Sequence, residues 1–371
     1  MAALPPAILA QARTNSNPYE GIGKSVFVNR SAVKLANLDA LFRLTDDAGN
    51  SKSTRNVQTR GWGLTLKGDQ DFALDKMHYS LRASDLFTPC YGSDCTGDIY
   101  KNENIGDFAE IVRKGTDGEG VDLVMGDGGF STAGDEWHQE EQSKQIMLCQ
   151  VLTMFLTLRN GGVEVDLRVL KRTAETHAVI SWNPTGGDFV LKVFDLFSPF
   201  MVDLIYILHC SFEKISILKP FSSRPANSER YVVCKSLLDH ERSDLIDHLF
   251  AANSELNAQR PPDTVVSSHS ATQPGFQSLE EKIAKGVTDV LRLVDGDVVK
   301  GDDAFENYVQ GINVKMSMMQ TDSLKELYKY AGDPTIPGFD QEDVRRRCSK
   351  QWMLPEVEDK TRHKFKGFWR V

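Results

Sequence analysis

Four charged residues that lie far apart in this chain could together activate a hydroxyl group: Lys34, Asp127, Lys192 and Glu229. Lys34 lies near the start of an expected helix, and Asp127 follows an apolar stretch at 121–125. Lys192 interrupts a second apolar stretch, and Glu229 lies in a loop rich in serine, proline and asparagine. Two lysines held together by two carboxylates point to methyl transfer onto a ribose 2′-oxygen.

The expected chemistry explains why these residue types occur together. A ribose hydroxyl is too weak an acid to attack unaided at neutral pH, and an amine such as that of Lys192 accepts a proton only when it is neutral. Burial and a second cation, supplied by Lys34, both disfavour the charged form of an amine. Asp127 and Glu229 would orient the two lysines. The four groups would therefore titrate as a coupled set.

Each of the four residues also has a purely structural explanation. Asp127 can be an ordinary turn residue at the end of a strand, and Lys34 can be a solvated helix lysine. Glu229 can pair with Arg230 or Arg224 on the surface. Lys192 fits a structural explanation least well, because an unpaired lysine inside an apolar strand is costly to bury.

The composition is that of a soluble globular protein with one large core or two domains. The 371 residues are 40% hydrophobic and 26% charged, with a formal net charge of −9. An acidic chain can bind RNA only through a local basic patch. The six cysteines form no Cys-x-x-Cys pair, so we expect no metal site, and their scattering fits a reducing compartment.

No targeting or membrane segment is expected. Residues 1–10 contain no basic stretch of the kind that begins a signal peptide. The most apolar stretch, at 189–212, contains Lys192, Asp195 and Asp203, which argues against a membrane span.

The pattern of apolar residues predicts an α/β core in which strands alternate with helices around a doubly wound sheet. Ligands bind such sheets at the carboxyl ends of the strands. The expected strands are 62–66, 121–125, 189–194, 215–221 and 231–237, and the expected helices are 31–42, 145–158 and 200–212.

We divide the chain into an N-terminal segment, a core, a linker and a helical extension. The N-terminal segment carries Lys34, the core is interrupted by an insertion at 163–187, and the linker becomes rich in proline, serine and threonine towards its end. The four parts are 1–60, 61–240, 241–275 and 276–371.

Six segments in the same order resemble the FtsJ/RrmJ-type 2′-O-methyltransferases, most closely those that methylate the first transcribed nucleotide of capped mRNA. The segments are NRSAVKLANLD, GWGLTLKG, VMGDGGFS, SKQIMLCQVL, FVLKVFDLFSPF and KPFSSRPANSERYVVCK. The resemblance implies a Rossmann-like sheet that binds S-adenosylmethionine, and it places the family's Lys-Asp-Lys-Glu tetrad on the four residues above. It also implies a capped mRNA 5′ end as substrate, contact with the RNA polymerase II machinery, no DNA or membrane partner, and a nuclear location. In the family a further domain follows residue 371, so we expect the chain to be a fragment.

The resemblance assigns further roles outside the tetrad. Asn29 matches a cofactor contact, and Asp98 with Ile99 matches the segment that contacts the adenine side of the cofactor. Arg13 and Asn227 match positions that contact the capped RNA. Asp98 can instead be a loop turn residue, and Arg13 can be simply solvated.

The chain departs from the family pattern in two places. The family has a first strand that ends in a glycine loop of the form Asp-x-x-x-Gly-Pro-Gly-Gly-Phe, where the backbone approaches the cofactor. Residues 43–60 stand at that place. They contain a single glycine, Gly49, and no apolar stretch that could form a strand. The insertion at 163–187 enters at the N-terminal end of the strand that carries Lys192, far from the expected site.

Two explanations fit these departures: a mis-assembled gene model with one exon dropped and one intron retained, or an isoform that has lost donor binding. Either predicts weak binding of S-adenosylmethionine. The alternative function is therefore a catalytically impaired protein that binds capped RNA. A dinucleotide-dependent oxidoreductase is disfavoured, because no Gly-x-Gly-x-x-Gly follows a strand.

Overall fold

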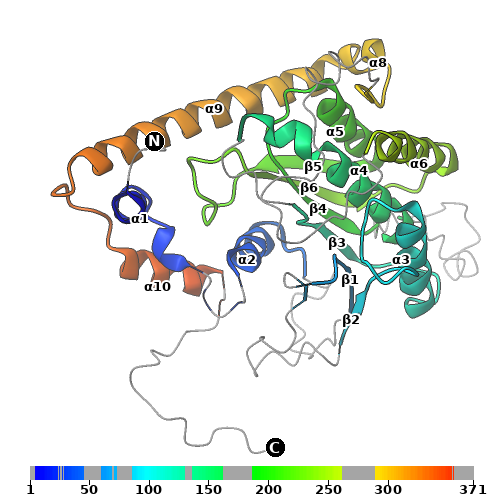
Figure 1. The fold of residues 1–371 in the computed structure, drawn as a ribbon, viewed down its shortest axis with the longest axis horizontal. Helices are drawn as coiled ribbons and strands as arrows, with labels where there is room; N and C mark the ends of the chain where they lie inside the picture. Colours follow the sequence, from blue (N-terminus) through cyan, green and yellow to red (C-terminus); the bar gives the residue numbers. More distant parts are fainter. Residues whose placement is uncertain are drawn as a thin grey trace, which may run out of the picture.

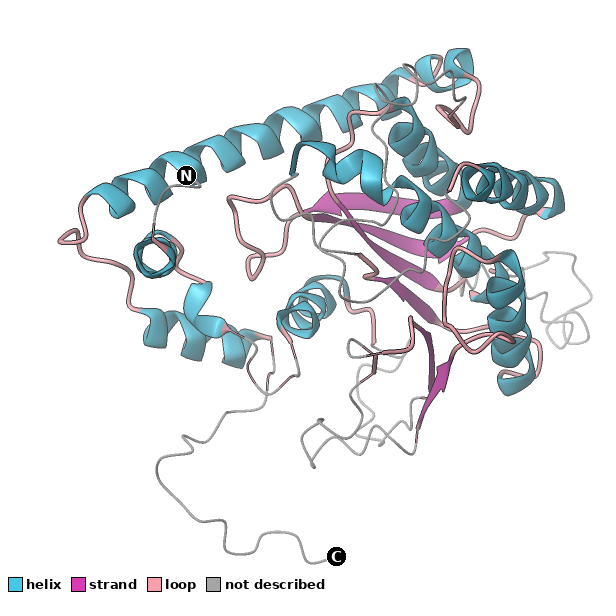
Figure 2. Ribbon diagram, viewed as in Figure 1, coloured by secondary structure: helices cyan, strands magenta, loops and turns pink. Residues whose placement is uncertain are grey.

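The computed structural model describes residues 5–23, 25, 27, 29–45, 60–68, 71–72, 86–129, 136–161, 186–260, 289–352 and 354. Helices cover both faces of a central sheet, and one long helix runs along the edge of that sheet (Figure 1). Within these residues the strands group into one sheet of four strands and one separate sheet of two (Figure 2).

The four-stranded sheet is mixed, with the strand order β3-β4-β6-β5. Strand β3 (Leu123–Gly126) runs parallel to β4 (Asp188–Val193). Strand β6 (Arg230–Leu237) is antiparallel both to β4 and to the edge strand β5 (Phe212–Leu218). The carboxyl ends of β3 and β4 therefore lie at the same edge of the sheet as the amino end of β6.

One face of this sheet is covered by α4 (Gln139–Thr157) and α5 (Pro199–Ser211). Successive residues of a strand point to opposite faces. Phe189 and Leu191 of β4 point to this face, where they join the main hydrophobic core, and both are fully buried. The main core therefore lies between the sheet and these two helices.

The opposite face is covered by α2 (Arg30–Phe42). Val190 of β4 points to this face and shares a hydrophobic cluster with Leu38 of α2. Val33, one turn before the middle of the helix, is also fully buried. Because α2 lies directly on the sheet, a side chain near its N-terminus can reach the edge where β4 ends.

The two-stranded sheet consists of β1 (Gly61–Leu64) and β2 (Phe87–Cys90), which are parallel. Helix α3 (Asn102–Gly115) packs on it through Phe108 and Val112. In the described residues no strand pairing joins this sheet to β3.

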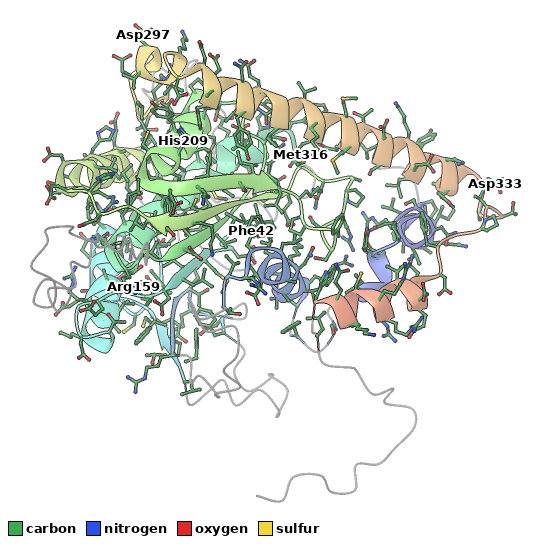
Figure 3. All side chains as sticks on the ribbon, turned by 180° about the vertical axis from the view of Figure 1, so that it is seen from behind. Phe42, Arg159, His209, Asp297, Met316 and Asp333 are labelled. Carbon is green, nitrogen blue, oxygen red and sulfur yellow. The ribbon has the colours of Figure 1, made fainter. Side chains whose placement is uncertain are left out.

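The described helices of the extension lie against other parts of the molecule. The first of them are α8 (Gly296–Lys300) and α9 (Asp303–Gly332). On α9, the Tyr308 hydroxyl accepts a hydrogen bond of 2.8 Å from the backbone N–H of Ile217, which lies on the edge strand β5. The long helix thus protects an otherwise open sheet edge. Figure 3 marks Met316 where α9 passes the sheet and Asp333 at its far end.

The last of the described helices, α10 (Gln341–Gln351), packs against η1 (Glu20–Ile22) and is hydrogen-bonded to the end of α1 (Pro6–Ser16). The side chain of Gln341 accepts a hydrogen bond from Gly21 N at 2.7 Å, and its amide donates to main-chain oxygens at the end of α1. Beyond α10, Trp352 is buried in the cluster that contains Val33 of α2. The C-terminal helices therefore support α2 from outside.

The expected strands and helices of the core are all present, with ends shifted by a few residues. One strand of the sheet, β6, returns antiparallel beside β4. One interpretation of the sequence was wrong. The stretch predicted as a linker at 241–275 begins with a helix, α6 (Ser243–Ala258), which buries Leu249 and Leu256 against the main core. The sequence prediction also missed α1, β2 and α3.

The predicted insertion leaves and re-enters the fold at one point. Most of it lies outside the described residues, but its flanks, Gly161 and Gly186, are adjacent. A Cβ atom built on Gly161 would lie 3.5 Å from the Gly186 nitrogen. The N–H of Gly187 donates to the main-chain oxygen of Arg159 at 2.8 Å. This point lies at the amino end of β4, the end opposite to Lys192.

We predict that joining Gly161 directly to Gly186, with residues 162–185 removed, gives a folded protein. Closing a loop costs about 0.6 kcal/mol more for each doubling of its length, so the shortened chain should be as stable as the full chain or slightly more stable. Thermal unfolding of both proteins measures this. A shortened chain that unfolds more than about 10 °C below the full chain would contradict the prediction, since about 1 kcal/mol corresponds to only a few degrees.

Candidate active site

The four residues singled out in the sequence meet at one edge of the four-stranded sheet. Asp127 directly follows β3, and Lys192 is the next-to-last residue of β4. Lys192 is paired in register with Tyr231 of β6, so Glu229, directly before β6, lies just beyond the end of β4. Lys34 reaches this edge from α2.

The four side chains form two ion pairs. The Lys34 Nζ atom lies 2.7 Å from Oε1 and 2.8 Å from Oε2 of Glu229. The Lys192 Nζ atom lies 3.2 Å from Oδ1 of Asp127 and donates to the Asp127 main-chain oxygen at 2.6 Å. The side chains of both lysines and of Glu229 are 12% exposed, and that of Asp127 is 25% exposed. Each partly buried ammonium group thus has its own carboxylate, which offsets the cost of burying charge.

Electrostatics link the two ion pairs into one cluster. Burial raises the pKa of the Glu229 carboxyl, but the ammonium group of Lys34 and the hydroxyl of Ser223 lower it more, so that the net pKa is below its ordinary value. Lys192 also contributes to this lowering. The positive charges of both lysines therefore stabilise the Glu229 carboxylate.

Two polar residues that the sequence prediction missed complete the cluster. The Tyr231 hydroxyl donates to Asp127 Oδ1 at 3.2 Å, and the Ser223 hydroxyl donates to Glu229 Oε1 at 2.7 Å. Burial and the nearby Asp127 carboxylate raise the pKa of Tyr231, so its hydroxyl keeps its proton. Tyr231 lies two residues after Glu229, and this period-2 spacing on a strand was the available signal.

The backbone that follows Asp127 leaves room beside the Lys192 amine. A Cβ atom on Gly129 would lie only 3.3 Å from Lys192 Nζ, so a side chain there would crowd the amine. The preceding residue, Gly128, is held against α4 by a hydrogen bond of 2.8 Å from its N–H to Gln150 Oε1. Because position 129 is a glycine, no side chain crowds the amine from this position.

Asn227 lies close to the tetrad, whereas Arg13 does not contact it. Asn227 is exposed, and both its main-chain and side-chain oxygens accept from the amine of Lys219 at 2.7 Å. Arg13 lies on α1, which packs on α9 rather than on the sheet.

The residues expected to contact a cofactor each have a local structural role. The side chain of Asn29 caps the N-terminus of α2 by accepting from Ala32 N at 3.2 Å. The Asp98 carboxylate accepts from Tyr100 N at 3.0 Å in the turn after β2, and Ile99 packs against the main core. Their roles toward a cofactor stay predictions.

The described part of the chain contains no group of three or more histidine, cysteine or acidic side chains placed to hold a metal ion. All six cysteines lie in described segments and are free thiols. None of the helices in those segments is long and apolar enough to cross a membrane.

Comparison with known proteins supplies independent information. A family model described as FtsJ-like methyltransferase matches residues 27–237, a range that includes the whole tetrad. The chain is 34% identical to the cap-specific mRNA (nucleoside-2′-O-)-methyltransferase 1 of Homo sapiens over 385 aligned positions, covering 94% of this chain and 40% of that protein. Proteins of the same name from Danio rerio and Dictyostelium discoideum are 35% and 31% identical, covering 94% and 95% of this chain and 40% and 45% of those proteins. The chain thus spans less than half the length of these relatives.

We predict that Glu229→Gln lowers the free energy of unfolding at pH 7 by about 3 kcal/mol, because it leaves the partly buried Lys34 without a carboxylate. A carboxyl group with a lowered pKa in the folded state contributes its stability above the unfolded value, near 4.5, and loses it as pH falls through the folded pKa. The difference in the free energy of unfolding between wild type and variant should therefore be constant from pH 8 to about 5 and should shrink at lower pH.

Urea unfolding at several pH values tests this, with Glu213→Gln as the control. Glu213 lies on β5 and pairs on the surface with Lys214, so its substitution should change stability by less than about 1 kcal/mol. A Glu229→Gln effect that grows towards acid pH would contradict the assignment.

Proposed function

The chain belongs to the FtsJ-like methyltransferase family, and on this basis we propose that its active site methylates the ribose 2′-hydroxyl of the first transcribed nucleotide of capped mRNA. The observation that carries the proposal is the pair of lysine–carboxylate contacts at one sheet edge, inside the matched region. The relatives are named as cap-specific mRNA 2′-O-methyltransferases, which supports the choice of substrate.

In this proposal Lys192 accepts the proton of the 2′-hydroxyl. Asp127 orients the amine through its carboxylate and its main-chain oxygen, and Gly129 leaves space for the sugar. Lys34, fixed by Glu229, supplies a positive charge where the oxygen becomes negative. Charges fixed in place in this way stabilise the transition state without having to reorganise. When bound, S-adenosylmethionine supplies the methyl group on a sulfonium.

The remaining site residues are assigned by position. Asp98 and Ile99, beyond the carboxyl end of β2, would contact the adenine side of the donor, and Asn29 would also contact the donor. Asn227 would contact the RNA through its Nδ2 group, because its Oδ1 atom already accepts from a lysine. Arg13 would contact the capped end of the RNA from α1.

We further propose that this chain has a Rossmann-like sheet without its first strand and glycine loop. In the Rossmann order 3-2-1-4-5-6, the first strand lies between the second and the fourth. Here β1 and β3 occupy those neighbouring places, and they belong to separate sheets in the described residues. Met125 of β3 is 51% exposed, which is unusual for a strand in the centre of a sheet.

The alignments also support a missing segment. They extend over 382 to 396 positions, more than the 371 residues of the chain, and therefore include positions at which this chain has no residue. Asn29, Asp98 and Ile99 would still contact part of the donor, but the glycine loop that the backbone needs to approach its methionine end would be missing.

We predict that the chain binds S-adenosylmethionine with a dissociation constant weaker than about 1 mM, which corresponds to about −4 kcal/mol. Calorimetric titration measures this affinity. The matched control is the same chain with the first strand and glycine loop of a relative inserted before Gly61, which should bind at least tenfold more tightly. Micromolar affinity of the unaltered chain would overturn the prediction.

A second candidate function is the binding of capped RNA without turnover. The separation of β1 and β3 into two sheets, as far as the described residues go, favours it, because the tetrad and Asn227 lie outside the strand proposed to be missing. For either function we propose that the protein acts on nascent transcripts in the nucleus, near the RNA polymerase II machinery, with RNA and not DNA as its ligand.

We predict that Lys192→Ala in the chain with the restored strand lowers methyl transfer by about 10²-fold or more, because it removes the proton acceptor. Affinity for capped RNA should stay within twofold. The assay uses capped RNA and labelled donor, with the label located on the first nucleotide. Lys235→Ala is the control, since Lys235 pairs with Asp188 at the opposite end of the sheet.

Full activity of the Lys192→Ala variant would exclude Lys192 as the base. Capped-RNA binding by the unaltered chain without any label transfer would favour the second candidate function.

A further inference from the structure

The loop between β5 and β6 carries Glu229, and the side chain of Lys219 joins the beginning of this loop to its end. Lys219 directly follows β5, and its amine donates three hydrogen bonds to the far end of the same loop. The acceptors are the main-chain oxygen of Asn227 at 2.7 Å, its Oδ1 atom at 2.7 Å, and the main-chain oxygen of Glu229 at 2.6 Å. These three acceptors match the three N–H donors that the amine has in its protonated form.

Elsewhere the loop is attached mainly by hydrogen bonds to neighbouring elements. Phe221 N donates to Asn37 Oδ1 of α2 at 2.9 Å, and the Ser228 hydroxyl contacts Gln139 Oε1 of α4 at 3.2 Å. The side chain of Phe221 is exposed. The Phe221 ring also packs against Tyr19, with ring centroids 5.5 Å apart, and Arg224 pairs with Glu20 at 2.8 Å. Polar contacts thus contribute much of what fixes the shape of the loop.

The charges and the burial around Lys219 suggest a catalytic role for its amine, but the hydrogen bonds of the amine exclude that role. Burial lowers the pKa of Lys219 to about 7, partly opposed by Glu229 and reinforced by Arg230 and Lys34. A lysine with such a pKa is a candidate general base at neutral pH. Its amine, however, is turned into the neck of the loop and surrounded by three oxygen atoms, so a substrate hydroxyl cannot take the place of these partners without opening the loop.

We propose that Lys219 is a positioning residue, which fixes the backbone at Glu229 so that the carboxylate meets the Lys34 amine. Lys34 contacts the carboxylate of Glu229, whereas Lys219 holds the peptide group of the same residue. Without that hold, the last part of the loop could move away from α2, and the ion pair would separate. The relevance of this role to methyl transfer rests on the proposed function; the role itself does not.

A double-mutant cycle tests the proposal without donor or RNA. Lys34→Met, Glu229→Gln and the double variant give the coupling between the two side chains from their urea unfolding midpoints. The cycle is measured in wild type and in the Lys219→Met background. We expect the coupling to fall by at least half in Lys219→Met and to be largely restored in Lys219→Arg, which keeps the donors.

A residue that merely adds stability would lower all four midpoints equally and leave the coupling unchanged, and this result would overturn the proposal. Lys235→Met is the matched background, because it removes another partly buried lysine of the same sheet; it should leave the coupling intact. If the Lys219→Met protein does not fold, Lys219→Gln serves in its place, since a neutral amide keeps only some of the hydrogen bonds. A loss of methyl transfer in any variant would not affect this readout.

Discussion

The antiparallel pairing of β6 with β4 is the constraint on which the site depends. It brings the start of β6 to the edge where β3 and β4 end, and the register that pairs Lys192 with Tyr231 sets Glu229 just beyond the last residues of β4. In a parallel arrangement Glu229 would lie at the opposite end of the sheet. The same pairing sets the Tyr231 hydroxyl beside Asp127. The ion pair of Lys192 with Asp127 is thereby linked to β6, the strand that begins directly after Glu229.

The N- and C-terminal helices have a part in the same geometry. Lys34 is the only member of the tetrad that does not come from the sheet edge, so its position depends on how firmly α2 is held. One side of α2 packs on the sheet through Leu38. On another side, Val33 belongs to the hydrophobic cluster that contains Trp352, beyond α10. The 276–371 extension is thus joined to the catalytic elements, at least through its described helices.

Much of the sheet could be predicted from the sequence, because strands buried on both faces are almost continuously apolar. Strand β2 was missed for a physical reason: it contains Pro89, and proline weakens the case for any strand. Helix α6 was missed because the proline-rich stretch that follows it suggested a linker from 241 onward, although Leu249 and Leu256 are spaced as on a helix face.

The tetrad was identified by its resemblance to a family rather than by its chemistry alone, and the structure brings its members together. The contacts of Ser223 and Lys219 could not have been predicted, because they depend on how one loop folds back on itself. The antiparallel direction of β6 could not be predicted from the sequence either, because the pattern of apolar residues along a strand is the same for a parallel and an antiparallel strand. Sequence thus indicated which residues matter, and tertiary structure determines how they are held.

A crystal structure of the chain with a short capped RNA tests the central claim most directly, because it locates the ribose relative to the tetrad. The account predicts that the 2′-oxygen of the first transcribed nucleotide lies about 3 Å from Lys192 Nζ, within reach of a proton transfer. Capped RNA bound with this oxygen remote from both Lys192 and Lys34 would contradict the account.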